Sequence, residues 1–149
     1  MNDLLHDPLI LRQIIMDHYE YPHNHALSED PHYGSVHMAS ESCIDDITVQ
    51  ALISDGKIAD VRFDGIACTI STASTSIMTE LLIGKTLAEA EAIIDQYNAM
   101  INMGSYDENV LEEAVAFHNV GRQANRIKCA TIGWKAIHQL IDESGAKHD

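Results

Sequence analysis

Two short segments of alternating apolar and polar residues mark a β-hairpin in the first half of the chain. The alternation runs over residues 47–53 and again over 59–63, where Ala59 falls among the apolar positions. Asp55-Gly56 lies between the segments, and this dipeptide is typical of a tight two-residue turn. The pattern therefore predicts a hairpin with one buried face, and Ala59 is expected on that face.

The apolar residues elsewhere recur every three or four positions, which is typical of amphipathic helices. Ser71 is the expected N-cap of the second helix, and Thr86 with Glu89 has the spacing of a capping box at the start of the third. The helices are expected from Pro8 to Tyr19, from Ser71 to Gly84, from Thr86 to Tyr97, from Asp107 to Gly121, and from about Cys129 onward.

The order of these elements indicates the fold class. Strands come early, including a further short one expected over 35–39, and helices dominate the rest of the chain. Such segregation is typical of an α+β fold, here a small antiparallel β-sheet packed against several α-helices. No repeat or low-complexity linker divides the sequence, so we expect a single domain over residues 1–149 with loosely held ends.

The charge of the chain limits its partners. Nine lysines and arginines stand against 23 aspartates and glutamates, so the formal charge is 9 − 23 = −14 with histidines neutral. Acidity of this size repels phosphate backbones and anionic lipid, which argues against nucleic-acid and membrane partners. The N-terminus lacks the basic start of a signal peptide, and no stretch approaches the roughly 20 apolar residues of a membrane helix. We therefore expect a cytoplasmic protein.

Three cysteines carry the candidate chemistry. Cys43 precedes the hairpin, Cys68 follows its second strand, and Cys129 opens the last predicted helix. Ends of regular elements are common places for functional groups, so the three thiols could converge at one edge of the sheet. Asp45 lies two residues after Cys43, on the same side of an extended segment. Three sulfurs and one oxygen complete a tetrahedral zinc shell, although free cysteines also serve as small buried hydrophobes.

The histidines give a weaker signal. Nine are present, and His18 lies on the first predicted helix. None has the spacing of a catalytic His-Glu-x-x-His metal site. We expect His18 to be a packed or capping side chain instead of a metal ligand.

At this point the chain resembles the U-type iron–sulfur cluster assembly family, and within it the SufU branch. The interval of 61 residues (129 − 68) between Cys68 and Cys129 resembles the longer segment typical of SufU, and Lys128 stands where IscU-like scaffolds usually carry histidine. The resemblance is carried by Ile15-Met16-Asp17-His18-Tyr19 with Pro22, Cys43-Ile44-Asp45, Gly65-Ile66-Ala67-Cys68-Thr69-Ile70-Ser71, and Arg126-Ile127-Lys128-Cys129-Ala130-Thr131.

The resemblance implies a fold of the IscU/SufU type and a zinc site formed by Cys43, Asp45, Cys68 and Cys129. It implies a zinc-dependent sulfurtransferase in which Cys43 accepts persulfide sulfur from a SufS-type cysteine desulfurase and relays it to other iron–sulfur assembly proteins. The family also includes scaffolds, which hold a transient iron–sulfur cluster on the same residues. A third hypothesis is a non-catalytic module that binds the desulfurase and uses zinc only to stabilise its fold.

Three features near the cysteines bear on this expectation. Three thiolates and a carboxylate leave a formal charge of about −2 around Zn²⁺, which Arg126 and Lys128 could offset. Cys129, at the predicted start of a helix, would gain from the helix dipole. The family usually has glycine where Ile44 stands, and a β-branched residue would be strained if that position needed a positive φ. All four candidate ligands are present, so we still expect zinc to bind.

Overall fold

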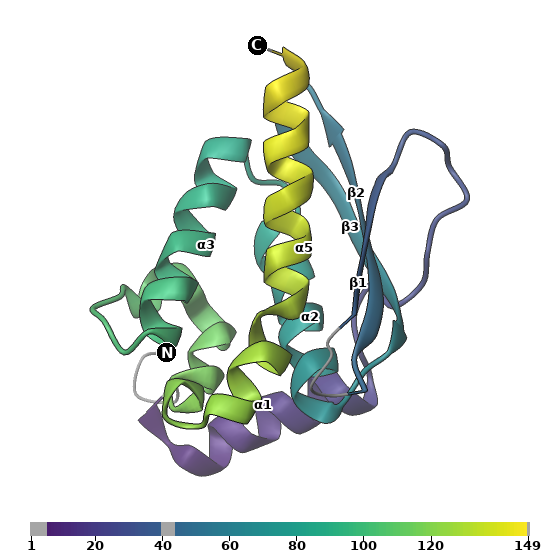
Figure 1. The fold of residues 1–149 in the computed structure, drawn as a ribbon. Helices are drawn as coiled ribbons and strands as arrows, with labels where there is room; N and C mark the ends of the chain where they lie inside the picture. The colour runs from purple at the N-terminus through teal and green to yellow at the C-terminus, as the bar shows by residue number, and fades with distance from the viewer. Residues whose placement is uncertain (1–5, 40–43, 149) are drawn as a thin grey trace.

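A three-stranded antiparallel sheet forms one side of the computed structural model, which describes residues 6–39 and 44–148, the last four by their backbone alone. Within these residues the strands are β1 (Gly34–Ala39), β2 (Asp46–Ser54) and β3 (Lys57–Ile66), in the spatial order β1-β2-β3. Helices cover one face of the sheet (Figure 1). The predicted α+β class and its small antiparallel sheet are confirmed.

The β2–β3 hairpin turns where the sequence predicted. Asp55 and Gly56 have φ values of 54° and 74°, the left-handed conformation that a tight hairpin turn requires. The prediction for Ala59 is wrong, because a bulge shifts the register: Leu52 pairs with Asp60, but the next residue of β2 pairs with Ile58. Ala59 is therefore the extra, exposed residue, and Ile58 is buried in its place.

The helices match the sequence pattern except in the last third. The broken segment between α3 and α5 replaces the single helix expected over residues 107–121. Glu112 interrupts it, because its φ of 47° ends one helical turn and begins the next. The elements are α1 (Pro8–Glu20), α2 (Thr69–Leu82), α3 (Leu87–Ile101), α4 (Glu108–Leu111), η2 (Glu112–Phe117), η3 (Val120–Arg122) and α5 (Ala124–His148).

The long helix α5 organises the molecule. In Figure 1 it runs between α3 and the sheet, while α1 lies across the end of the molecule opposite the C-terminus. It packs against α2 and against β1 and β2. Trp134 and Ile137 of α5 are buried, and so are Val49 and Phe63 of the sheet. One apolar core therefore lies between the sheet and the helices.

The buried side chains of α2 are unusually polar for a central helix. Six small hydroxyl residues on it are at most 7% exposed, and they allow neighbouring helices to approach closely. At Gly133 of α5, an added Cβ would lie 2.4 Å from Thr75 Oγ1. Glycine is therefore required at this crossing of α2 and α5. The six residues are Ser71, Thr72, Ser74, Thr75, Ser76 and Thr79.

His18 joins α1 to two other elements. It is 5% exposed, and its Nδ1 lies 2.7 Å from Ser76 Oγ on α2. Its Nε2 lies 3.2 Å from Glu113 Oε1 on η2. A neutral ring with the proton on Nε2 donates to Glu113 and accepts from the Ser76 hydroxyl. The expectation of a packed histidine is confirmed.

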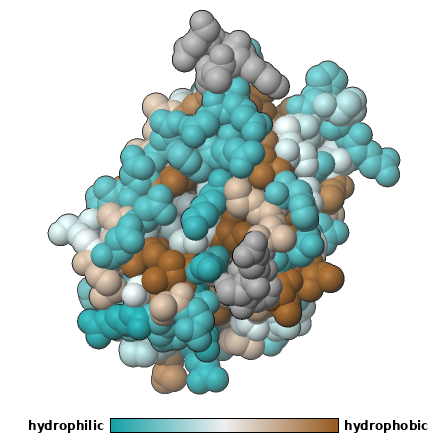
Figure 2. All heavy atoms as spheres, viewed as in Figure 1, coloured by the Kyte–Doolittle hydropathy of each residue, from teal (hydrophilic) through white to brown (hydrophobic). Residues whose placement is uncertain are grey.

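The surface agrees with the acidic composition. Hydrophilic side chains cover most of the face in Figure 2, with smaller hydrophobic areas between them. Within the described residues, no helix combines the length and the apolar character needed to cross a bilayer.

Candidate metal centre

Three of the four predicted ligands meet at one end of the molecule. Asp45 immediately precedes β2, Cys68 lies between β3 and α2, and Cys129 lies near the start of α5. One carboxylate oxygen and the two sulfur atoms all lie within 4.8 Å of one another. Cys43 lies outside the described residues, so its predicted place in the set stays a prediction.

Cys68 is the N-cap of α2. Its φ and ψ of −72° and 173° are extended, and its Sγ accepts a hydrogen bond from the Ser71 backbone N–H at 3.4 Å. The predicted cap at Ser71 is wrong, because Ser71 lies inside the first turn and the sulfur satisfies the amide that an oxygen would otherwise bind. Negative charge at this sulfur lies at the positive end of the α2 dipole.

Asp45 is held against Cys68 by two of its atoms. The side chain is 1% exposed, and its Oδ1 accepts the Cys68 backbone N–H at 2.8 Å. Its Oδ2 lies 3.9 Å from Cys68 Sγ. Hydrogen bonds stabilise a carboxylate that is removed from water, and a divalent cation beside the two thiols would stabilise it further.

Gly65 allows β3 to reach the site. Its φ is 134°, and a Cβ at this position would lie 2.2 Å from the backbone oxygen of Asp46. Gly65 pairs with Ile47, two residues after Asp45. The close approach of the two strands therefore sets where the chain leaves β3 and turns toward Cys68.

Cys129 lies in the second turn of α5, not at its start. The helix begins at Ala124, and Cys129 Sγ is 3.8 Å from the carbonyl oxygen of Asn125 within the same helix. The expectation that Cys129 gains from a helix N-terminus is therefore wrong. Cys68 is the cysteine that occupies such a position.

The donor atoms suit a zinc ion. Ligand atoms at about 2.0–2.3 Å from a tetrahedral zinc stand about 3.3–3.8 Å apart. The distance of 3.9 Å between Asp45 Oδ2 and Cys68 Sγ is close to this spacing. Two thiols and one carboxylate fill three positions of such a shell and leave the fourth for another ligand, which we expect to be Cys43.

Ile44 is a described residue, and its side chain is 67% exposed. Its φ angle also depends on Cys43, which lies outside the described residues. The expectation of strain at this position therefore stays a prediction.

A cleft of about 400 Å³ opens beside the site. Arg12, Thr69, Ile70 and Arg126 are among the residues that line it, so it borders the segments next to both described cysteines. Arg126 and Lys128 are exposed, and neither forms an ion pair within the described part of the chain. Their predicted role in offsetting the charge of the site stays a prediction. Sequence reasoning missed Arg12, because no local motif connects α1 with the cysteines.

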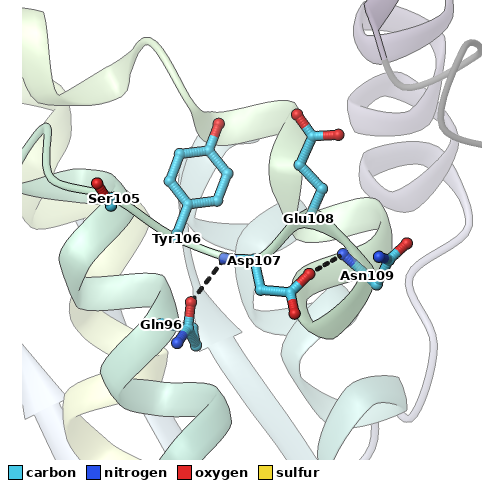
Figure 3. A pocket seen from close by; sticks show the side chains of 6 residues that line it. All are labelled: Gln96, Ser105, Tyr106, Asp107, Glu108 and Asn109. Carbon is cyan, nitrogen blue, oxygen red and sulfur yellow. Dashed lines mark hydrogen bonds between the residues drawn. The ribbon is translucent and has the colours of Figure 1, made fainter.

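A second cavity, of about 540 Å³, is lined by none of the cysteines (Figure 3). Gln96 and Ser105–Asn109 line it. The Asp107 N–H donates to Gln96 Oε1 at 2.7 Å, and Asp107 Oδ1 accepts from the Asn109 N–H at 2.9 Å. These groups shape the loop and cap α4.

Known proteins resemble the chain over most of its length. Residues 10–148 match the family described as NifU-like N terminal domain. A Streptococcus pyogenes serotype M1 protein named iron–sulfur cluster assembly scaffold protein IscU is 34% identical over 137 residues, which cover 91% of this chain and 85% of that protein. A Bacillus subtilis protein named zinc-dependent sulfurtransferase SufU is 34% identical over 133 residues, or 89% of each chain.

The fold is also similar to solved structures. The crystal structure of a Fervidobacterium islandicum protein, described as a candidate iron–sulfur cluster assembly scaffold for the SUF system, matches with a TM-score of 0.76. The sequences are 33% identical, and the match covers 85% of this chain and 92% of that one.

Proposed function

The chain belongs to the NifU-like N-terminal domain family of iron–sulfur cluster assembly proteins, and we propose that within this family it is a zinc-dependent sulfur carrier. The observation that carries the proposal is the convergence of Asp45, Cys68 and Cys129 within 4.8 Å. The Bacillus subtilis relative, which matches 89% of the chain, is named a zinc-dependent sulfurtransferase, and this name supports the carrier.

In this proposal Cys43, Asp45, Cys68 and Cys129 hold the ion, and bound zinc keeps the thiols deprotonated. The Cys43 thiolate attacks the outer sulfur of a cysteine persulfide on a SufS-type desulfurase. The persulfide S–S bond breaks, the desulfurase cysteine leaves as a thiolate, and Cys43 becomes the persulfide. This exchange needs no further oxidant or reductant. Transfer of the outer sulfur from Cys43 to a thiol of another assembly protein is the same kind of exchange. We propose that it occurs in the cytoplasm, on a single domain over residues 1–149.

The carrier is tested by adding the purified protein and cysteine to a SufS-type desulfurase and measuring alanine. We expect saturable stimulation of cysteine turnover, because the carrier removes sulfur from the enzyme after each cycle. Cys43→Ala is expected to fold and to bind the enzyme without stimulating it. Absence of stimulation by the wild-type chain at saturating amounts, with binding demonstrated, would refute the carrier.

A cluster scaffold is the second candidate, and the scaffold names of the relatives from Streptococcus and Fervidobacterium favour it. Ligand identity does not separate the two roles, because both use the same four residues. Desulfurase, cysteine and iron together do separate them. A scaffold develops visible cluster absorption and transfers the cluster, whereas a carrier stays colourless. If Cys43→Ala instead prevents folding, the zinc-stabilised binding module is supported.

A further inference from the structure

A closed hydrogen-bond network is centred on the carbonyl of Ala130, the residue that follows Cys129 in α5. Ser74 Oγ on α2 and the Tyr97 hydroxyl on α3 lie 2.7 Å and 2.6 Å from the Ala130 carbonyl oxygen on α5. The two hydroxyls are 3.0 Å apart, and Trp134 Nε1 donates to Ser74 Oγ at 3.0 Å. We call these four groups the Ala130 clamp. Each of these residues is at most 1% exposed.

The clamp satisfies its own polar atoms. The indole N–H and both hydroxyl protons have acceptors within it, so none of these buried donors lacks a partner. Tyr97 stacks on Trp134 with ring centroids 3.9 Å apart. Burial raises the pKa of Tyr97 far above its usual value, so the phenol remains a neutral donor. A satisfied network in an apolar interior holds its members in one arrangement.

The clamp joins the two helices that carry the described cysteines. Ala130 follows Cys129 directly in α5. Ser74 lies six residues after Cys68, which places it about 9 Å further along α2. Gly133 of α5 and Thr75 of α2 keep the same two helices in close contact just beyond Ala130 and Ser74 along each helix. Sliding or rotation of α5 against α2 would therefore break the clamp and move the Cys129 sulfur.

We propose that the Ala130 clamp is a positioning device that sets the distance between the sulfur atoms of Cys68 and Cys129. The inference rests on the proposed zinc site, because a fixed spacing matters where two sulfurs bind one ion. Ligands that are held in place before the metal arrives bind it more tightly. The clamp residues touch neither sulfur in this role, so they act through the position of α5.

The test compares matched variants of the full chain. Ser74→Ala and the isosteric Tyr97→Phe are loaded with Co²⁺, whose absorption bands report ligand geometry, and zinc affinity is measured by chelator competition. We expect a loss of affinity of about tenfold or more and altered cobalt bands, as for other residues that orient metal ligands. Tyr97→Phe preserves volume and carries the test if Ser74→Ala does not fold.

Ser76→Ala is the control. It removes another fully buried serine hydroxyl from α2, but Ser76 binds His18 and the His23 N–H instead of α5. We expect it to lower stability while leaving metal affinity and the cobalt bands unchanged. Wild-type affinity in both clamp variants, or an equal loss in Ser76→Ala, would overturn the inference.

A metal-free measurement separates this inference from the proposed function. Phenylarsine oxide binds two thiols that are held close together, and in a Cys43→Ala background it reports the spacing of Cys68 and Cys129. We expect Ser74→Ala to weaken this binding and Ser76→Ala to leave it unchanged. If the clamp variants change arsenical binding but the wild-type chain takes up no zinc, the proposed function fails while the positioning role stands. Unchanged arsenical binding in the clamp variants would contradict the positioning role itself.

Discussion

Gly65 shows how one residue without a side chain determines the site. Its φ of 134° and the 2.2 Å separation between a Cβ and the Asp46 oxygen exclude any larger residue without movement of the backbone. The movement would occur beside Asp45, because Asp46 follows it in the chain. The site therefore depends on close contact between two backbones as well as on its ligands.

Gly65→Ala is expected to lower the free energy of unfolding by about 3 kcal/mol and to reduce zinc binding, because β3 must move away from β2. Urea unfolding and metal analysis measure the two effects. Gly56→Ala is the control, because Gly56 also has a positive φ but no atom within 4 Å of an added Cβ. It should cost about 1 kcal/mol and leave metal binding intact. Equal effects of the two substitutions would contradict this explanation.

At the residue scale, the sequence singled out the three candidate ligands that the structure brings together, but not how two of them are held. Their type and spacing indicated Asp45, Cys68 and Cys129. Cys68 was not predicted as a helix cap, because serine is the commoner cap and Ser71 stands nearby. Cys129 was placed at a helix start because the first turn of α5 is mostly polar and exposed. Apolar periodicity begins only after that turn.

At the scale of elements, local signals predicted the structure well where they were complete. Thr86 and Glu89 form the capping box at the start of α3, with both hydrogen bonds present. The segment over residues 107–121 lacked such a signal at its break. Glu112 adopts a conformation that favours glycine, and a glutamate gives no indication of it in the sequence. Tertiary contacts, including the Glu113 bond to His18, accompany this break.

The contact between α1 and η2 predicts a pH dependence. The hydrogen bond from His18 lowers the pKa of Glu113 below its ordinary value of 4.5. A carboxyl group with a lowered folded-state pKa contributes stability above pH 4.5, and that contribution is lost as the pH falls through the folded-state value. Glu113→Gln should therefore lower the unfolding free energy at about pH 6.5 but make little difference at about pH 3.

Urea unfolding at the two pH values measures the difference between wild type and variant. Glu112→Gln is the control, because it removes the same charge from the neighbouring residue, whose side chain forms no hydrogen bond within the described part of the chain. It should show a smaller and less pH-dependent effect. A deficit in Glu113→Gln that persists at the acidic pH would contradict the proposed origin of the stability.

At the scale of the whole molecule, a bound ion would link three parts of the chain that are distant in sequence. The segments at the starts of β2, α2 and α5 meet at the candidate centre. A ligand that binds only the folded chain stabilises it by mass action. Free zinc at 100 times its dissociation constant contributes about 3 kcal/mol, or roughly 6–12 °C in the unfolding temperature.

Chelation should therefore lower the unfolding temperature of the zinc-loaded protein by roughly 6–12 °C, and added zinc should restore it. Calorimetry or circular dichroism measures the shift. Cys68→Ser is expected to start lower and to respond little to chelator, because one ligand is weakened. An unfolding temperature that does not change when zinc is removed and restored would argue against binding at this centre.

The buried tryptophan in the core provides an intrinsic fluorescence probe. Trp134 is the only tryptophan in the sequence, so all indole emission comes from one buried ring that rests on Tyr97. Its N–H bond to Ser74 makes the emission wavelength and intensity sensitive to small displacements of the neighbouring helix. Binding of ions or proteins near the thiols can thus be followed in real time by the tryptophan fluorescence, without an attached dye.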